Sequence, residues 1–215
     1  MRDYFIAIAG NIGAGKSTLT GMLARNLGWQ PFYEANDENP YLEDFYRDMR
    51  RWSFQSQAFF LSKRLEHHRQ LVDYPGSVVQ DRTVYEDAEV FARNLHRRDE
   101  MTARDYQTYR SLYGAICQFL PPPDLVIYLQ ASVDTLLRHI ARRGRDFEQT
   151  IQRQYVADLN GLYDEWIDGW TASPVLRVDM NRYDFQHDDA DFQMILAGVD
   201  HHLGFSPRRA QGQPD

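Results

Sequence analysis

A glycine-rich stretch near the start of the chain, Gly10-Asn11-Ile12-Gly13-Ala14-Gly15-Lys16-Ser17, lies between a short apolar run at residues 4–9 and an amphipathic segment at residues 18–27. It matches the pattern G-x-x-x-x-G-K-[ST], in which backbone N–H groups surround a polyphosphate, the lysine reaches the β- and γ-phosphate oxygens and the hydroxyl binds Mg²⁺. The helix that should follow adds positive partial charge at its N-terminus. We therefore expect this loop to bind a nucleoside triphosphate through Gly10, Asn11, Ile12, Gly13, Ala14, Gly15, Lys16, Ser17 and Thr18.

The lysine of this loop is unusual for the chain. Only Lys16 and Lys63 are lysines among 24 cationic residues, so a lysine in the loop indicates a need for a compact ammonium group. A GTPase would carry an Asn-Lys-x-Asp guanine reader, but Lys63 lies in Ser62-Lys63-Arg64-Leu65. The serine- and glycine-rich signature of a transport ATPase is also missing from the sequence. The pattern therefore favours a small-molecule kinase, in which a second substrate supplies the attacking hydroxyl.

Composition sets the broad class. The chain has 215 residues, 43% of them hydrophobic and 26% charged, which is ordinary globular usage. Its net charge of −7 argues against nucleic-acid binding and polybasic membrane binding. No apolar run approaches the ~20 residues of a membrane span, and the run that begins the chain is too short for a signal peptide. A single cysteine, Cys117, fits a reducing compartment, so we expect a soluble cytoplasmic protein.

Short apolar runs alternate with long amphipathic segments along the chain. This alternation predicts an α/β fold, a five-stranded parallel sheet with helices on both faces. We expect one domain over residues 1–203 and a disordered polar tail over residues 204–215. The expected strands are residues 4–9, 31–33, 77–80, 125–129 and 175–178, and the expected helices are residues 18–27, 52–72, 87–95, 102–119, 132–142, 149–166 and 191–203.

Five motifs in order along the chain carry a family resemblance. From Phe5 to about Val178 the chain resembles the deoxynucleoside kinase family, specifically the bacterial deoxyadenosine/deoxycytidine kinase type. The resemblance implies a P-loop kinase fold with an arginine-rich lid, which uses ATP and Mg²⁺ to phosphorylate the 5′-hydroxyl of a deoxynucleoside in nucleoside salvage. It also implies a homodimer. The motifs are Gly10 to Thr18, Glu34 with Asn39-Pro40-Tyr41-Leu42, Tyr46 through Arg64, Asp81-Arg82-Thr83 with Tyr85-Glu86-Asp87, and Arg143-Gly144-Arg145.

The resemblance assigns the reacting groups. Glu34 follows the second expected strand, at the sheet edge where ligands bind, and would accept the proton of the 5′-hydroxyl. Asp81 would hold Mg²⁺ together with Ser17, and Arg82 would contact the 5′-oxygen and the phosphate. The family usually has Glu-Arg-Ser where this chain has Asp-Arg-Thr, and the shorter carboxylate suits ligation through water.

The resemblance also assigns the nucleoside pocket. An amide such as that of Gln57 can bond the edge of a base in two places. Arg64 and Asp87 would line the pocket beyond it, and Phe91 would stack on the base. Two further residues, Tyr46 and Glu148, would hold the 3′-hydroxyl of the sugar.

The lid is the part of the pattern from which this chain departs. The family has Arg-x-x-x-Arg-x-Arg, and Arg143 and Arg145 match its last two arginines, which would act on the transferring phosphate. The first position is occupied by His139, so Arg138 or Arg142 is expected to substitute.

Three alternatives stay open at this point. The kinase could prefer deoxyguanosine, or it could act on nucleoside monophosphates, although Glu34 suits a hydroxyl better than a phosphate. A regulatory nucleotide-binding module without catalysis would keep Lys16 but would need neither Glu34 nor Arg82.

The adjacent histidines His67-His68 and His201-His202 lack zinc spacing and are expected at the surface.

Overall fold

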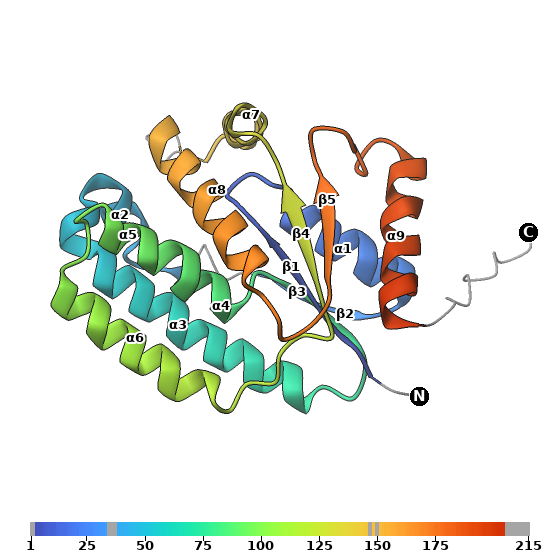
Figure 1. Ribbon diagram of the computed structural model, residues 1–215, viewed down its shortest axis with the longest axis horizontal. Coiled ribbons are helices and arrows are strands. Elements are labelled where there is room, and N and C mark those ends of the chain that lie inside the picture. The colour runs from blue at the N-terminus through green and yellow to red at the C-terminus, as the bar shows by residue number, and fades with distance from the viewer. Residues whose placement is uncertain (1–2, 34–37, 146–147, 149–150, 205–215) are drawn as a thin grey trace, which may run out of the picture.

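The computed structural model describes residues 3–33, 38–145, 148 and 151–204 (Figure 1). At its centre is a five-stranded sheet with the order β2-β3-β1-β4-β5, in which every neighbouring pair is parallel. The predicted parallel α/β fold is confirmed, and each predicted strand is present within one residue at either end. The strands are β1 (Phe5–Gly10), β2 (Gln30–Phe32), β3 (Val78–Asp81), β4 (Leu125–Gln130) and β5 (Val175–Asp179).

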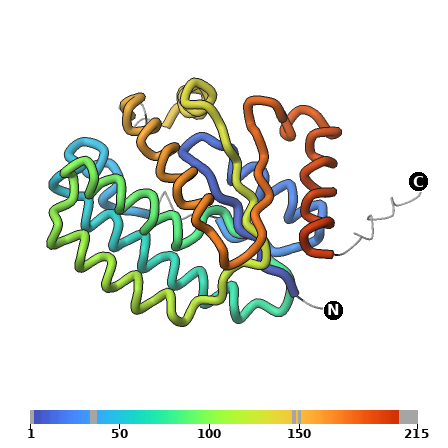
Figure 2. Tube along the Cα trace, viewed as in Figure 1, coloured from blue at the N-terminus to red at the C-terminus, as the bar shows by residue number. Residues whose placement is uncertain are grey.

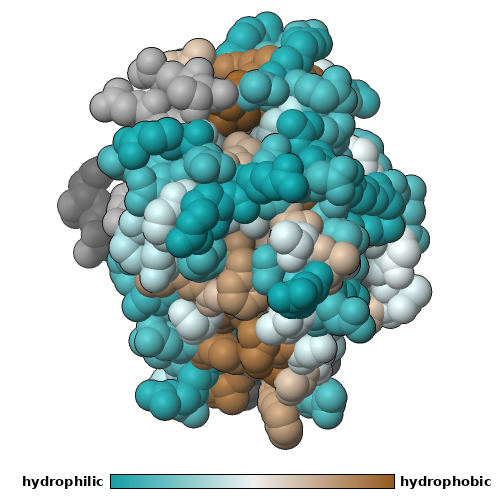
Figure 3. Space-filling view, turned by 90° about the vertical axis from the view of Figure 1, so that its left-hand side faces the viewer, coloured by the Kyte–Doolittle hydropathy of each residue, from teal (hydrophilic) through white to brown (hydrophobic). Residues whose placement is uncertain are grey.

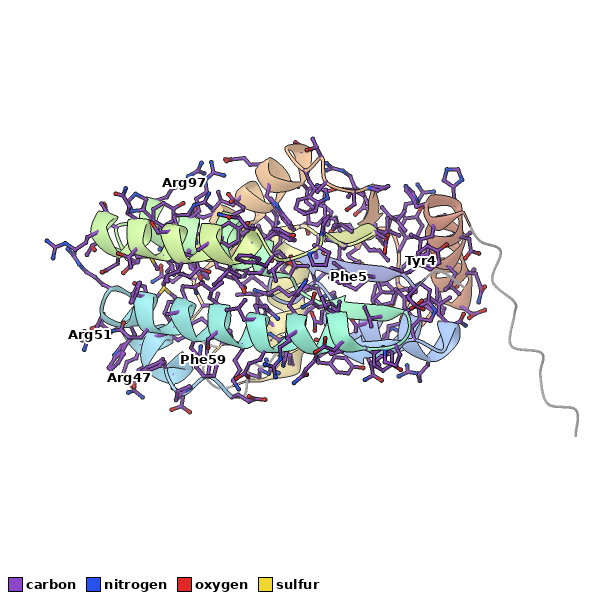
Figure 4. All side chains as sticks on the ribbon, turned by 90° about the horizontal axis from the view of Figure 1, so that it is seen from below. Tyr4, Phe5, Arg47, Arg51, Phe59 and Arg97 are labelled. Carbon is purple, nitrogen blue, oxygen red and sulfur yellow. The ribbon has the colours of Figure 1, made fainter. Side chains whose placement is uncertain are left out.

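Helices cover both faces of the sheet. Figure 1 shows α1 and α9 on one side and the layer containing α3, α6 and α8 on the other. Within that layer α3 and α6 run alongside each other, as Figure 4 also shows. The helices are α1 (Lys16–Leu27), α2 (Leu42–Arg47), α3 (Met49–Asp73), α4 (Val84–Glu86), the π-helical turn η2 (Asp87–Ala92), α5 (Arg93–Arg97), α6 (Ala103–Cys117), α7 (Val133–Arg143), α8 (Arg153–Asp168) and α9 (Asp189–Leu203).

Several helices begin or end at residue types that commonly cap helices. The side chains of Thr102 and Ser132 accept hydrogen bonds from the backbone N–H groups of Asp105 and Thr135, as N-caps do. Gly28 ends α1 in the left-handed conformation, with a φ of 70°. These local signals explain why the predicted starts of α6 and α7 are correct to one residue.

Four helical segments differ from the prediction. The helix predicted over residues 52–72 begins three residues earlier, at Met49, where the side chain of Asp48 accepts a hydrogen bond as the N-cap. The short helix α2 was not predicted, because six residues are too few to give a clear helical period. The segment predicted at residues 87–95 begins earlier, at Val84, where Thr83 and Glu86 form a capping box. It also contains the π-helical turn η2, and such turns are frequently found at functional sites. The helix predicted from residue 149 begins at Arg153.

The core determines where ligand groups can lie. All six residues of β1 and all four of β3 are buried. Ile8 and Asp81 are register partners, so the carboxyl ends of these two strands lie side by side. In open parallel sheets ligands bind at this edge. Among the helices of the described residues, none is long and apolar enough to cross a membrane.

The histidine pairs do not all lie at the surface as predicted. His68 is buried in α3, with its ring edge-on to Phe5 at 6.2 Å between centroids. The prediction was wrong for this residue because α3 packs against β1 at that point. His201 is exposed, as expected. Of the predicted tail, only Gly204 is described, and it ends α9 as a left-handed C-cap.

Candidate active site

The glycine-rich loop joins β1 to α1 at the carboxyl edge of the sheet. Gly10 has a φ of 149°, and a Cβ atom there would lie 2.8 Å from the carbonyl oxygen of Leu129, so only glycine fits. Lys16 is buried, and its Nζ donates to the carbonyl oxygen of Asn11 over 3.0 Å. The ammonium group is thus held across the loop rather than extended into solvent. That position places a positive charge beside the backbone of the loop.

A fully buried carboxylate supports this loop from behind. Glu86 accepts hydrogen bonds from the backbone N–H of Gly10 at 3.3 Å, the backbone N–H of Thr83 at 2.8 Å and the hydroxyl of Tyr163 at 2.9 Å. Burial raises the pKa of Glu86, while Arg82 and Lys16 act in the opposite direction. Glu86 lies in the motif Tyr85-Glu86-Asp87, but no role was predicted for it from the sequence. No local pattern reveals that its partner Gly10 lies 76 residues away.

The first helical turn of α1 meets the end of β3. Ser17 Oγ donates to Asp81 Oδ2 over 2.5 Å, so the two predicted metal ligands are adjacent. Among the described residues, no group of three or more His, Cys, Asp or Glu side chains is gathered for a metal ion. A hydroxyl with one carboxylate fits Mg²⁺, which keeps several waters and takes its remaining oxygens from substrate phosphates.

A single cavity of about 560 Å³ connects the glycine-rich loop with the helical layer. Four of the predicted site residues are buried and do not line this cavity, namely Gly10, Asn11, Arg64 and Asp81. Glu34 lies outside the described residues. The predicted site residues that line the cavity are Ile12, Gly13, Ala14, Gly15, Lys16, Ser17, Thr18, Tyr46, Gln57, Arg82, Asp87, Phe91, Arg143, Arg145 and Glu148.

Arg82 occupies a strained position between the loop and the helical layer. Its φ of 63° is in the left-handed region, which non-glycine residues seldom adopt. Its guanidinium lies 4.3 Å from the centre of the Phe91 ring, and such a contact is attractive. Strain of this kind persists where the surroundings fix it and is concentrated at active sites.

The polar side chains at the far end of the cavity are almost fully buried. Arg64 Nε donates to Asp87 Oδ2 over 3.0 Å, and both side chains are almost fully buried. Gln57 is 4% exposed, and its Oε1 has no hydrogen-bond partner among the described residues. A buried carbonyl oxygen without a hydrogen-bond donor costs free energy, so this end of the cavity suits a ligand that offers a donor.

The predicted lid arginines meet at one carboxylate. Arg143 Nε donates to Glu148 Oε2 over 3.0 Å, and a second guanidinium nitrogen pairs with Oε1. Arg145 lies 3.8 Å from the same carboxylate. Both candidates for the missing lid arginine line the cavity, namely Arg138 and Arg142. The structure brings the lid and the predicted sugar-binding Glu148 together.

The cavity concentrates positive charge in a chain whose net charge is −7. Its described lining includes Lys16 and six arginines but only three carboxylates, those of Asp87, Glu148 and Asp184. Such a cluster attracts anionic ligands.

The sixth arginine, Arg182, lies in the loop of residues 180–187, which also lines the cavity. Sequence reasoning missed this loop, although its place after the carboxyl end of β5 is a signal for it.

Comparison with known proteins agrees with this geometry. The family model for deoxynucleoside kinases matches residues 6–204. A deoxyadenosine/deoxycytidine kinase of Bacillus subtilis is 39% identical over 197 residues, which cover 91% of each chain. A deoxyguanosine kinase of the same organism is 36% identical over 200 residues, covering 91% of this chain and 95% of the relative.

A solved structure with the same architecture is a deoxyadenosine kinase from M. mycoides, with dCMP and a flexible dCDP bound. It is 31% identical, covers 92% of this chain and 99% of its own, and superimposes with a TM-score of 0.81. The family match spans nearly the whole described chain, and the cavity joins a phosphate loop to a polar pocket. The chain therefore belongs to the deoxynucleoside kinase family.

Proposed function

We propose that the protein transfers the γ-phosphate of ATP to the 5′-hydroxyl of a deoxynucleoside, with deoxyadenosine and deoxycytidine as preferred substrates. The observation that carries the proposal is the single cavity that runs from Lys16 to the buried polar group of Gln57 and Asp87. Phosphoryl transfer requires mainly positioning and charge stabilisation, and the cavity provides cations at one end and hydrogen-bonding groups at the other.

In this proposal the loop end stabilises the phosphates. Lys16 contacts the β- and γ-phosphate oxygens, Arg82 contacts the 5′-oxygen and the transferring phosphate, and Arg143 and Arg145 neutralise charge that develops during transfer. Glu34, outside the described residues, accepts the proton from the 5′-hydroxyl. Ser17 and Asp81 would hold Mg²⁺, which neutralises phosphate charge when bound. Tyr46 and Glu148 bind the sugar.

The base preference is proposed from the far end of the cavity. Adenine and cytosine each present an exocyclic amine beside a ring acceptor, which suits Asp87 and the amide of Gln57. Guanine presents a carbonyl where adenine has its amine, so it would place an acceptor opposite Asp87. A deoxyguanosine preference is the second candidate, because a deoxyguanosine kinase is nearly as similar as the deoxyadenosine/deoxycytidine kinase.

We also propose a homodimer of single-domain subunits in the cytoplasm. Figure 3 shows apolar side chains gathered on the face that lies at the left of Figure 1. On α6 and just beyond it, Leu112 is 45% exposed and Phe119 is 83% exposed. Exposed apolar patches mark interaction surfaces, and a second copy would cover these side chains. Light scattering should give twice the chain mass, and Leu112→Glu with Phe119→Glu should give a monomer, whereas Met194→Glu on α9 should leave the dimer intact.

The experiment that tests the proposed function offers the protein labelled ATP, Mg²⁺ and a panel of acceptors. The panel contains the four deoxynucleosides, their ribonucleoside counterparts and the deoxynucleoside monophosphates. We expect label on deoxyadenosine and deoxycytidine, less on deoxyguanosine and least on thymidine. Label on monophosphates would instead indicate a nucleoside-monophosphate kinase. ATP binding without label transfer to any acceptor would indicate a non-catalytic module.

A further inference from the structure

His139 on α7 contacts the tip of the glycine-rich loop directly. Its Nδ1 lies 2.9 Å from the carbonyl oxygen of Gly13, although the two residues are 126 positions apart in the sequence. A carbonyl oxygen can only accept a hydrogen bond, so Nδ1 must carry the proton. This bond therefore fixes the orientation of the ring, with Nδ1 facing the loop. The same bond can form whether or not Nε2 is protonated.

The backbone around this bond is closely packed. Gly13 has a φ of 82°, and a Cβ atom there would lie 2.9 Å from the carbonyl oxygen of Leu136 and 3.0 Å from Cγ1 of Ile140. The loop tip thus rests on one turn of α7. Figure 2 shows the yellow segment of α7 beside the blue loop that follows β1. A small rotation of α7 would move Gly13, and with it the N–H groups of the loop.

The first turn of α7 is anchored on a different element. Asn181, just after β5, accepts hydrogen bonds through Oδ1 from the backbone N–H of Ser132 and from the hydroxyl of Thr135, each over 3.0 Å. Arg143, which lines the cavity, follows His139 by four residues and so lies on the same side of the helix. Two anchors one turn apart therefore fix the rotation of the helix that carries the lid arginines.

We propose that His139 is a positioning residue that locks α7 to the phosphate loop through its Nδ1–H bond to Gly13, and that it acts by geometry rather than by charge. The lid pattern of the family has an arginine at this position, where a cation would act on phosphate. In this chain the ring is used to join the lid helix to the loop. The inference deepens the proposed function and rests on it for the turnover measurements only.

The test compares substitutions that place a hydrogen-bond donor at the position of histidine Nδ1 or at that of Nε2. The amide nitrogen of asparagine occupies about the place of histidine Nδ1, whereas the amide nitrogen of glutamine reaches about the place of Nε2. We expect His139→Ala and His139→Gln to weaken ATP binding, measured by calorimetry without acceptor, by roughly three- to tenfold, as expected for one lost hydrogen bond. His139→Asn should stay within about twofold of the wild type. Turnover should fall in the same order.

Two comparisons complete the design. His201→Ala changes an exposed histidine on α9 and should leave ATP affinity and turnover unchanged. His139→Lys supplies charge without a donor at the Nδ1 position, and we expect it to bind ATP no better than His139→Ala. Thermal unfolding of each variant without ligand checks that the fold survives, and the Asn and Gln pair decides the matter even if the Ala variant unfolds.

The proposal would be overturned if His139→Asn were as impaired as His139→Ala, if His139→Ala matched the wild type, or if His139→Lys exceeded His139→Asn. A wild-type protein that binds ATP but phosphorylates no deoxynucleoside would contradict the proposed function alone, because the ranking of the His139 variants rests on ATP binding. A wild-type protein that binds no ATP would contradict both.

Discussion

Arg64 Nε and Asp87 Oδ2 lie 3.0 Å apart, and the two side chains are 3% and 4% exposed. A buried ion pair is stable only while both members are present, since removal of one strands the other charge in a medium of low polarity. Asp87 lines the cavity, whereas Arg64 does not. The pair can therefore present a carboxylate oxygen to a base without leaving an uncompensated charge.

This relationship predicts how base preference can be changed. Either single substitution, Arg64→Met or Asp87→Ala, should damage activity with every substrate, because a stranded partner costs about 3–5 kcal/mol. The double substitution should raise thymidine kcat/KM relative to deoxyadenosine by roughly 5- to 150-fold, the range for one buried polar mismatch of about 1–3 kcal/mol. Steady-state kinetics on the four deoxynucleosides measures this ratio.

An exposed arginine–aspartate pair offers a matched control for that experiment. Arg177 and Asp168 are bonded at the surface, with side chains 43% and 70% exposed. Arg177→Met with Asp168→Ala should leave the preference ratio unchanged, since exposed pairs contribute little. An unaltered ratio in the Arg64 and Asp87 double variant would show that those two residues do not read the base.

Lys16→Met should abolish most turnover while the fold survives. Methionine replaces the buried stem of the side chain but removes the charge that acts on the transferring phosphate, so kcat should fall by roughly 10²- to 10³-fold. Lys63, the other lysine, pairs with Glu38 and Glu66 at the surface, and Lys63→Met should retain activity. Circular dichroism and kinetics check both variants, and near-normal kcat in a folded Lys16→Met protein would rule out the assignment of the loop.

Glu34→Gln should lower kcat by roughly 10²-fold or more, with a smaller change in the KM for the nucleoside. The amide keeps the size of the side chain but cannot accept the proton, so the loss falls on the transition state. Glu43→Gln, an exposed carboxylate in α2, should leave both constants unchanged. A raised KM with an unaltered kcat would make Glu34 a binding residue only.

His68 should make stability depend on pH. Burial lowers its pKa, so the unfolded chain binds more protons than the folded chain between the lowered value and the usual ~6.5. The free energy of unfolding should therefore decrease as the pH falls below ~6.5. His68→Leu should remove this part of the dependence, whereas His201→Ala should not. Urea titrations between pH 5 and 8 measure the free energy of unfolding at each pH. The prediction would be wrong if this free energy changed with pH to the same extent in the wild type and in His68→Leu.

The parts of the fold that the sequence predicted depend on local signals. The loop from Gly10 to Ser17 has a fixed pattern of residue types, and Thr102 and Ser132 are of residue types that commonly cap helix starts. The strand order and the burial of His68 depend on which elements pack together, which no local pattern encodes. The same reason explains why the bonds of Glu86 to Gly10 and of His139 to Gly13 were not predicted.

Transfer of the γ-phosphate of ATP to the 5′-oxygen of a deoxynucleoside can be measured with two acceptors that differ in one oxygen. With [γ-³²P]ATP and Mg²⁺, the wild-type protein should transfer label to deoxyadenosine, giving a product identical to deoxyadenosine 5′-monophosphate. It should transfer none to 2′,5′-dideoxyadenosine, which lacks the attacking hydroxyl. Equal labelling of both acceptors, or release of label only as inorganic phosphate, would show that the protein does not phosphorylate the 5′-hydroxyl.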